Sequence, residues 1–199
     1  MSSIFDQTYH NYLMKIKRLN LQSLSKKIGT EWDGKRMKLK LFTRHFWVSE
    51  KGIFNVSGER PSHSEVVVIA NYLIRYPDKK ISHRGKWLHY RDFKDSAPLL
   101  DAFHNNVERK LSLYFKQNIE SLVKSCKNLD GISYGEEWGY DVGFLFNALP
   151  DISVLLLFND VDEMFPAHCN VLFKETIKHY LDMESVAILG LILTDYLLS

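Results

Sequence analysis

The sequence predicts an α+β protein with a single core, in which small antiparallel sheets pack with about five helices. Residues that alternate between apolar and polar are grouped in two regions, 37–56 and 140–158, whereas segments of helical period gather elsewhere in the chain. No internal repeat, low-complexity tract or long linker divides the 199 residues. An apolar content of 45% and an aromatic content of 13% are ample for one packed interior.

The N-terminal region 1–28 is predicted to form an amphipathic helix, either continuous or broken near Leu19–Asn20, packed on or appended to the core. Apolar side chains such as Tyr9, Tyr12 and Ile16 recur there at helical spacing, with Lys and Gln between them. Gly29 supplies a stop signal. We therefore expect residues 29–199 to form a single α+β domain behind this helix.

A region of antiparallel strands follows. Asp33–Gly34 is a typical hairpin turn, and apolar residues alternate with lysines over 37–41. Two further apolar pieces, 46–48 and 53–56, flank a turn at 50–52. These patterns predict three or four strands.

Helices are predicted for the middle of the chain. Ser62 and Glu65 form a capping box at the start of a helix that ends before Pro77. Apolar residues at helical spacing predict two more helices, at about 99–116 and 118–129.

The C-terminal third combines strands, an acidic turn and a helix. Alternation over 140–146 and an apolar run at 152–158 predict an antiparallel pair. The acidic turn 159–163 follows, and we expect packed elements on both sides to hold it. Asp182 is predicted to cap a final buried helix.

Composition excludes several classes of function. The net charge of +2, without a stacking or basic-helix motif, argues against nucleic-acid binding. The chain shows no secretory signal, its most apolar C-terminal run is too short to cross a membrane, and its two cysteines form no CxxC motif, so we expect a cytoplasmic protein without a membrane partner. The sequence lacks the GxSxG, Walker A and GxGxxG motifs, which argues against a common serine hydrolase, a kinase or a Rossmann-type nucleotide-binding protein.

Three motifs run in one order along the chain. They are R-P-S at Arg60–Ser62, G-x-W-x-x-Y-R from Gly85 to Arg91, and D-x-D-E-x-F-P-A from Asp160 to Ala167. With them the chain, from about Tyr12 to Leu198, resembles an uncharacterised domain-of-unknown-function family of anaerobic bacteria and archaea. The resemblance implies a role in anaerobic metabolism, with an iron–sulfur protein as one partner, and it transfers no activity and no cofactor.

Polar and aromatic residues of the first two motifs are the candidate ligand-binding site. An arginine fork binds carboxylate or phosphate in two parallel bonds, and a helix N-terminus adds N–H donors. Together with aromatic rings these groups fit a small anionic or planar ligand. The candidate residues are Arg60, Ser62, His63, Trp87, Tyr90 and Arg91.

The third motif offers a candidate metal site at Asp160, Asp162 and Glu163. Hard cations prefer several oxygen ligands from one loop, although the spacing fails the EF-hand pattern. The alternative is a structural turn whose acids cap the backbone or pair with Arg60 or Arg91. The neighbouring His168 and Cys169 are not expected to serve one site, because adjacent strand residues point to opposite faces.

The leading functional hypothesis is an uncharacterised accessory protein, more consistent with a binding module than with an enzyme. It would bind a small anionic or planar ligand, or a protein partner, in anaerobic metabolism. The alternative is a metal-assisted hydrolase or transferase that uses the acidic turn.

Overall fold

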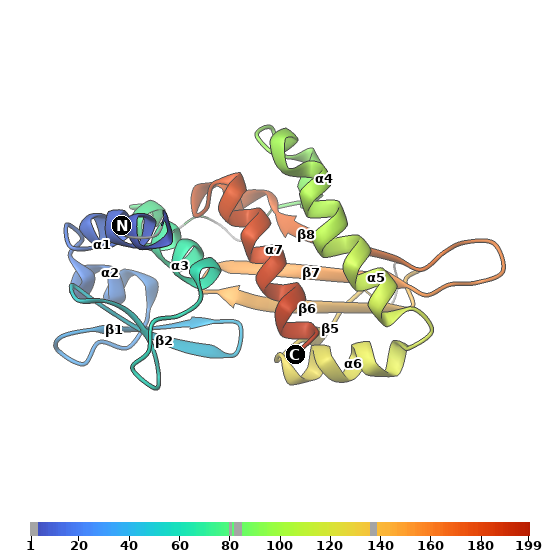
Figure 1. Ribbon diagram of the computed structural model, residues 1–199, viewed down its shortest axis with the longest axis horizontal. Coiled ribbons are helices and arrows are strands. Elements are labelled where there is room, and N and C mark those ends of the chain that lie inside the picture. The colour runs from blue at the N-terminus through green and yellow to red at the C-terminus, as the bar shows by residue number, and fades with distance from the viewer. Residues whose placement is uncertain (1–3, 80, 82–84, 136–138) are drawn as a thin grey trace.

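The computed structural model describes residues 4–79, 81, 85–135 and 139–199 (Figure 1). Its helices and two antiparallel sheets confirm the predicted α+β class. The helices are α1 (Ile4–Ile16), α2 (Leu21–Ile28), α3 (His63–Arg75), α4 (Leu100–Phe103), α5 (Arg109–Phe115), α6 (Ile119–Asn128) and α7 (Met183–Leu197). The strands are β1 (Met37–Leu41), β2 (Arg44–Ser49), β3 (Gly52–Asn55), β4 (Trp87–His89), β5 (Ile132–Ser133), β6 (Val142–Leu149), β7 (Ile152–Asn159) and β8 (His168–Lys174).

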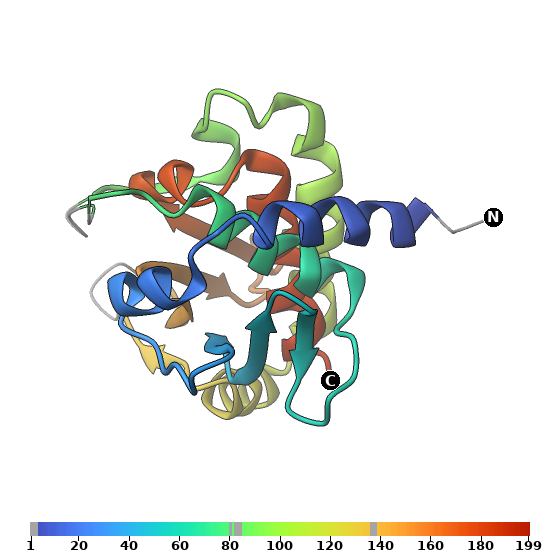
Figure 2. The ribbon, with the colours of Figure 1, turned by 90° about the vertical axis from the view of Figure 1, so that its left-hand side faces the viewer.

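The N-terminal region forms two helices, and the helical run is broken before Leu21, at the place where the sequence allows a break. The side chain of Asn20 accepts a hydrogen bond from the Ser23 backbone and starts α2, and Gly29 ends it in the left-handed conformation at φ 82°. Helix α1 lies against α3 (Figure 2). Ile16, Leu21 and Ile28 are buried in the same core as the rest of the chain.

The small sheet has the order β1-β2-β3 with antiparallel pairing throughout. The predicted turn at 50–52 joins β2 to β3. Asp33–Gly34 lies in a turn that is flanked by an isolated antiparallel bridge between Trp32 and Met37. The capping box of Ser62 and Glu65 starts α3 as predicted.

The large sheet has the order β4-β8-β7-β6-β5 and is antiparallel. The predicted pair is present as β6 and β7. Two short edge strands complete the sheet, and β4 reaches only the last three residues of β8, Leu172–Lys174. Among the described residues, no strand pairs with the first four residues of β8 on that side.

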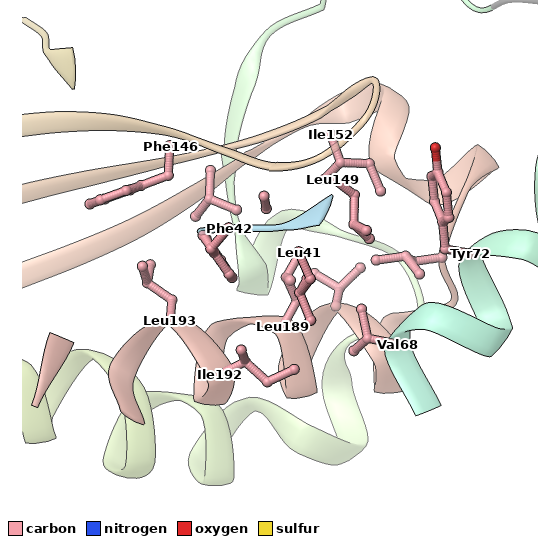
Figure 3. Close-up of a cluster of buried hydrophobic side chains, with 14 of the residues drawn as sticks. Leu41, Phe42, Val68, Tyr72, Phe146, Leu149, Ile152, Leu189, Ile192 and Leu193 are labelled. Atoms are coloured by element: carbon pink, nitrogen blue, oxygen red, sulfur yellow. The ribbon is translucent and has the colours of Figure 1, made fainter. Parts of the chain in front are cut away.

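Helices cover one face of the large sheet. Helix α7 runs across β6 and β7, and α4 and α5 lie beside it (Figure 1). Leu41 and Phe42 from the small sheet, Val68 and Tyr72 of α3 and residues of β6 and α7 meet in one core (Figure 3). On the opposite face Leu155, Leu157 and Leu172 form a smaller cluster under Trp87, Tyr134 and Tyr140.

The predicted helix at 99–116 has an irregular middle. Between α4 and α5 the residues His104–Glu108 form a π-helical segment, so that residues 100–115 make one continuous rod with a wider turn inside it. π segments are rare and occur often at functional sites. This one lies against β8 and α7.

Candidate ligand site at the edge of the large sheet

A cavity of about 460 Å³ lies at the open edge of β8, beyond the end of β4. We call it the edge cavity. Its volume is in the range of small-molecule sites. Its polar lining includes Arg91, His104, Glu108, Tyr140, His168 and Asn170.

The π-helical segment supplies two of these groups. His104 and Glu108 are four residues apart, and His104 Nδ1 lies 3.2 Å from Glu108 Oε2. The other carboxylate oxygen of Glu108 accepts a hydrogen bond from the Val171 backbone N–H at 3.3 Å. Val171 is in the part of β8 that β4 does not cover, so Glu108 takes the place of a strand partner. The hydrogen bond from the Val171 N–H in turn holds the Glu108 carboxylate in position.

A second set of groups comes from β8 and from the start of β6. His168 Nε2 is 3.0 Å from Asn170 Oδ1, and Asn170 Nδ2 donates to the Tyr140 hydroxyl oxygen at 3.3 Å. Asn170 is 7% exposed, so its amide is held between these two partners. Three side chains from two strand regions are thereby fixed at one wall of the cavity.

Tyr90 and Arg91 are the predicted ligand-binding residues that line the edge cavity. The Tyr90 ring stacks on Phe103 at 4.4 Å and 18°, and its hydroxyl donates to the Met183 carbonyl. Burial, with Asp182 and Glu184 nearby, raises the pKa of Tyr90 to about 12, so this hydroxyl stays protonated. The Arg91 side chain is 71% exposed, and its Nε lies 3.9 Å from Asp92, too far for a hydrogen bond.

Arg60, Ser62 and His63 lie elsewhere. Arg60 pairs with Asp6 at 3.0 Å and its guanidinium stacks on Tyr9, while the His63 ring contacts Phe5. The Ser62 side chain caps α3.

The R-P-S residues and the pair Tyr90–Arg91 lie at opposite ends of α7. Ser62 bonds the Glu65 carboxylate, and the same carboxylate bonds Tyr196 near the C-terminal end of α7. Tyr90 instead bonds Met183, the first residue of α7. Thirteen residues of helix separate these ends by about 20 Å. The six candidate residues therefore do not gather in one place, because helix packing and not sequence order sets their separation.

Trp87 belongs to the outer face of the sheet. The Lys174 ammonium lies 4.1 Å from the centre of its ring, and Tyr134 contacts the ring edge. Its indole Nε1 is buried without a hydrogen-bond acceptor among the described residues. Trp87 therefore packs beside the edge cavity without lining it.

The acidic turn forms the tip of a hairpin that projects beyond the helices, between β7 and β8 (Figure 1). Asp160 Oδ1 accepts hydrogen bonds from the Gln117 and Val161 backbones, and Asp162 Oδ1 accepts from Met164 and Phe165. Asp162 and Glu163 are exposed. As expected, the turn lies between packed elements, the strands β7 and β8, and Asp160 is bonded to the Gln117 backbone and to Asp141, although the tip itself is exposed.

The carboxylates at this tip act as backbone caps. Within the part of the chain that the structure describes, no three His, Cys, Asp or Glu side chains converge closely enough to hold a metal ion. Neither Arg60 nor Arg91 has a partner in the turn, since Arg60 bonds Asp6 and Arg91 lies beside Asp92.

Of the six polar residues named above for the edge cavity, only Arg91 was predicted as a ligand-binding residue. The spacing of His104 and Glu108 places both on one helix face, and that signal was available. His168 and Cys169 do point to opposite faces, as expected, with His168 exposed and Cys169 buried in the core. Nothing in the sequence signals that Asn170 bridges His168 to Tyr140, because that contact needs β6 and β8 on the same sheet.

No curated protein and no solved structure matches the chain. Within the described residues every helix is too short or too polar to span a membrane. The family model described as a domain of unknown function, DUF3786, matches residues 20–196. Since this match covers most of the chain, the protein belongs to the DUF3786 family.

Proposed function

We propose that the protein is a binding module and that the edge cavity holds a small ligand that is anionic and partly planar. The observation that carries this proposal is the exposed guanidinium of Arg91 on the same cavity as His104, His168 and Tyr140. A guanidinium without a hydrogen-bonded carboxylate is suited to bind an anion in two parallel bonds. The partly exposed ring of Tyr140 lines the same cavity and suits a planar group, whereas the stacked rings of Tyr90 and Phe103 are buried behind the wall.

The polar groups of this wall are already oriented. Glu108 is bonded at both oxygens and Asn170 at both ends of its amide, so a ligand would not have to order them. Preorganised groups of this kind lower the entropic cost of binding. This supports a ligand site over an incidental hollow of the surface.

The test is a calorimetric titration with two probes, nicotinate as a planar carboxylate and inorganic phosphate. We expect Arg91→Gln to weaken binding of the preferred probe about tenfold or more, since a charge-assisted hydrogen bond contributes about 1.5–3 kcal/mol. Arg18→Gln, an exposed arginine of the N-terminal region, is the matched control and should leave the affinity unchanged. Equal affinities in all three proteins, or no binding of either probe, would contradict the proposal.

The setting of this binding is a further part of the proposal. Both cysteines are free and buried, which supports a reducing cytoplasm. The role in anaerobic metabolism and the iron–sulfur partner rest on the family resemblance. The exposed Met164 and Phe165 at the tip of the hairpin offer apolar anchors to such a protein, and comparing the anaerobic pull-down of the normal chain with Phe165→Ser tests this.

A further inference from the structure

The edge cavity carries a proton acceptor and a proton donor, and hydrogen bonds to neighbouring side chains of its wall orient each of them. The two groups are His104 and Tyr140. Their hydrogen-bond partners decide which atoms remain available to a ligand, so that the chemistry of the cavity follows from the donor and acceptor rules.

His104 presents an acceptor. A carboxylate oxygen only accepts, so the contact of His104 Nδ1 with Glu108 Oε2 places the ring proton on Nδ1. In the neutral tautomer that keeps its proton on Nδ1, Nε2 carries the lone pair. Glu108 is itself anchored by the Val171 N–H, so it fixes both the tautomer and the orientation of the imidazole. A histidine oriented by a carboxylate in this way is suited to act as a general base.

Tyr140 presents a donor. The Asn170 carbonyl oxygen only accepts, so His168 Nε2 donates to it, and the amide of Asn170 then donates to the Tyr140 oxygen. The tyrosine oxygen is thus an acceptor on one side, and its own proton is left to donate to another group. Each bond in this series polarises the next, which strengthens the donor at its end.

We propose that the edge cavity is a proton-transfer site in which His104 is the general base and Tyr140 the general acid, acting on a small 2-oxo acid. The proposal rests on the ligand site proposed above and names its substrate class. A 2-oxo acid has a carboxylate for Arg91, a carbonyl oxygen for the Tyr140 hydroxyl and an acidic C–H beside the carbonyl for His104.

The reaction is a keto–enol tautomerisation. His104 Nε2 takes the proton from the carbon next to the carbonyl, the C–H electron pair forms the carbon–carbon double bond, and the carbonyl π pair takes the Tyr140 proton. The product is the enol, with tyrosinate and imidazolium left on the protein. The reverse step returns the imidazolium proton to C3 and the enol O–H proton to the tyrosinate, and if the enol leaves, the imidazolium loses its proton to solvent while the tyrosinate takes one from solvent. The step therefore needs no oxidant and no second substrate. Glu108 and Asn170 are positioning residues.

Exchange of C3 protons for deuterium, followed by proton NMR in D₂O with phenylpyruvate and 2-oxobutyrate as probes, measures this step directly. We expect the protein to accelerate exchange and His104→Ala to lower the rate about 100-fold or more, the usual contribution of a general base. Tyr140→Phe should lower it at least about tenfold. His179→Ala and Tyr114→Phe, an exposed residue of each type, are the matched controls and should keep the full rate.

The positioning role has its own readout. In Glu108→Gln the amide no longer fixes the ring proton, so nitrogen NMR of His104 should change from one tautomer to a mixture, and kcat should fall while KM stays nearly constant. Circular dichroism of each variant separates these effects from loss of the fold.

The outcomes separate the two proposals. Binding of a probe that depends on Arg91, with no exchange above that of free imidazole, would overturn proton transfer and leave the ligand site standing. Full exchange in folded His104→Ala would also overturn it. Absence of both binding and exchange at saturating probe would overturn both proposals.

Discussion

Replacement of Glu65 tests how a buried carboxylate joins three parts of the fold. Glu65 is 4% exposed and follows the N-cap of α3. One oxygen accepts hydrogen bonds from the Tyr196 hydroxyl near the end of α7 and from Arg44 of β2, and the other accepts from the Ser62 backbone. We expect Glu65→Ala to destabilise the protein strongly.

The magnitude follows from the groups left without an acceptor. An unpaired, partly buried Tyr196 hydroxyl costs about 1–3 kcal/mol, and loss of half of the capping box costs about 1 kcal/mol. The Arg44 side chain is 54% exposed, so its ion pair adds less than about 1 kcal/mol. The total is a loss of about 2–4 kcal/mol in the free energy of unfolding.

Urea unfolding followed by circular dichroism is the assay, with Glu65→Gln as the isosteric control. Glutamine keeps an acceptor for Tyr196, so its loss should stay near 1 kcal/mol. A double-mutant cycle with Tyr196→Phe should give a coupling energy above about 0.5 kcal/mol. Additive effects in that cycle, or an alanine variant as stable as the normal chain, would refute the reasoning.

The same residue makes stability depend on pH. Burial by itself raises the pKa of Glu65, but hydrogen bonds from Tyr196 and Ser62 outweigh it, and the net pKa lies below its ordinary value. The stabilisation is therefore complete above the unfolded pKa of about 4.3 and is lost as the pH falls through the folded pKa. The stability gap between the normal chain and Glu65→Gln should narrow between pH 6 and pH 3, and a constant gap would contradict this assignment.

Three further predictions concern buried thiols, a crowded glycine and the hairpin tip. Burial raises the pKa of Cys126 to about 12 and also raises that of Cys169, so a disulfide reagent should label both thiols slowly at pH 8 and rapidly in urea; fast labelling of the folded protein would count against their burial. Gly143→Ala should lower Tm by about 3–8 °C, because an added Cβ would lie 1.9 Å from the Tyr134 carbonyl oxygen, and an unchanged melting curve would show that this approach is not needed. Phe165→Ser should change the free energy of unfolding by less than about 0.5 kcal/mol, because this side chain is 64% exposed; a larger loss in urea would mean that the tip packs on the body.

Local sequence patterns determined the elements of this protein. Alternation located β6, a continuous apolar run located β7, the capping box located the start of α3, and Asp182 located the start of α7. These signals act within a few residues, so they are readable without a fold. Strand geometry is equally local: adjacent residues point to opposite faces, so the prediction that His168 and Cys169 do not share a site is readable from the sequence.

Only the tertiary structure decided the candidate site. Arg60 and Arg91 are both attractive in sequence, but α7 separates their positions, and no local pattern gives that distance. The edge cavity exists because β4 is shorter than β8 and because a π-helical segment brings Glu108 to the uncovered Val171. Strand pairing and helix packing join residues that are far apart in the chain. The sequence alone therefore identifies the chemical groups, and only the tertiary structure determines which of them lie together.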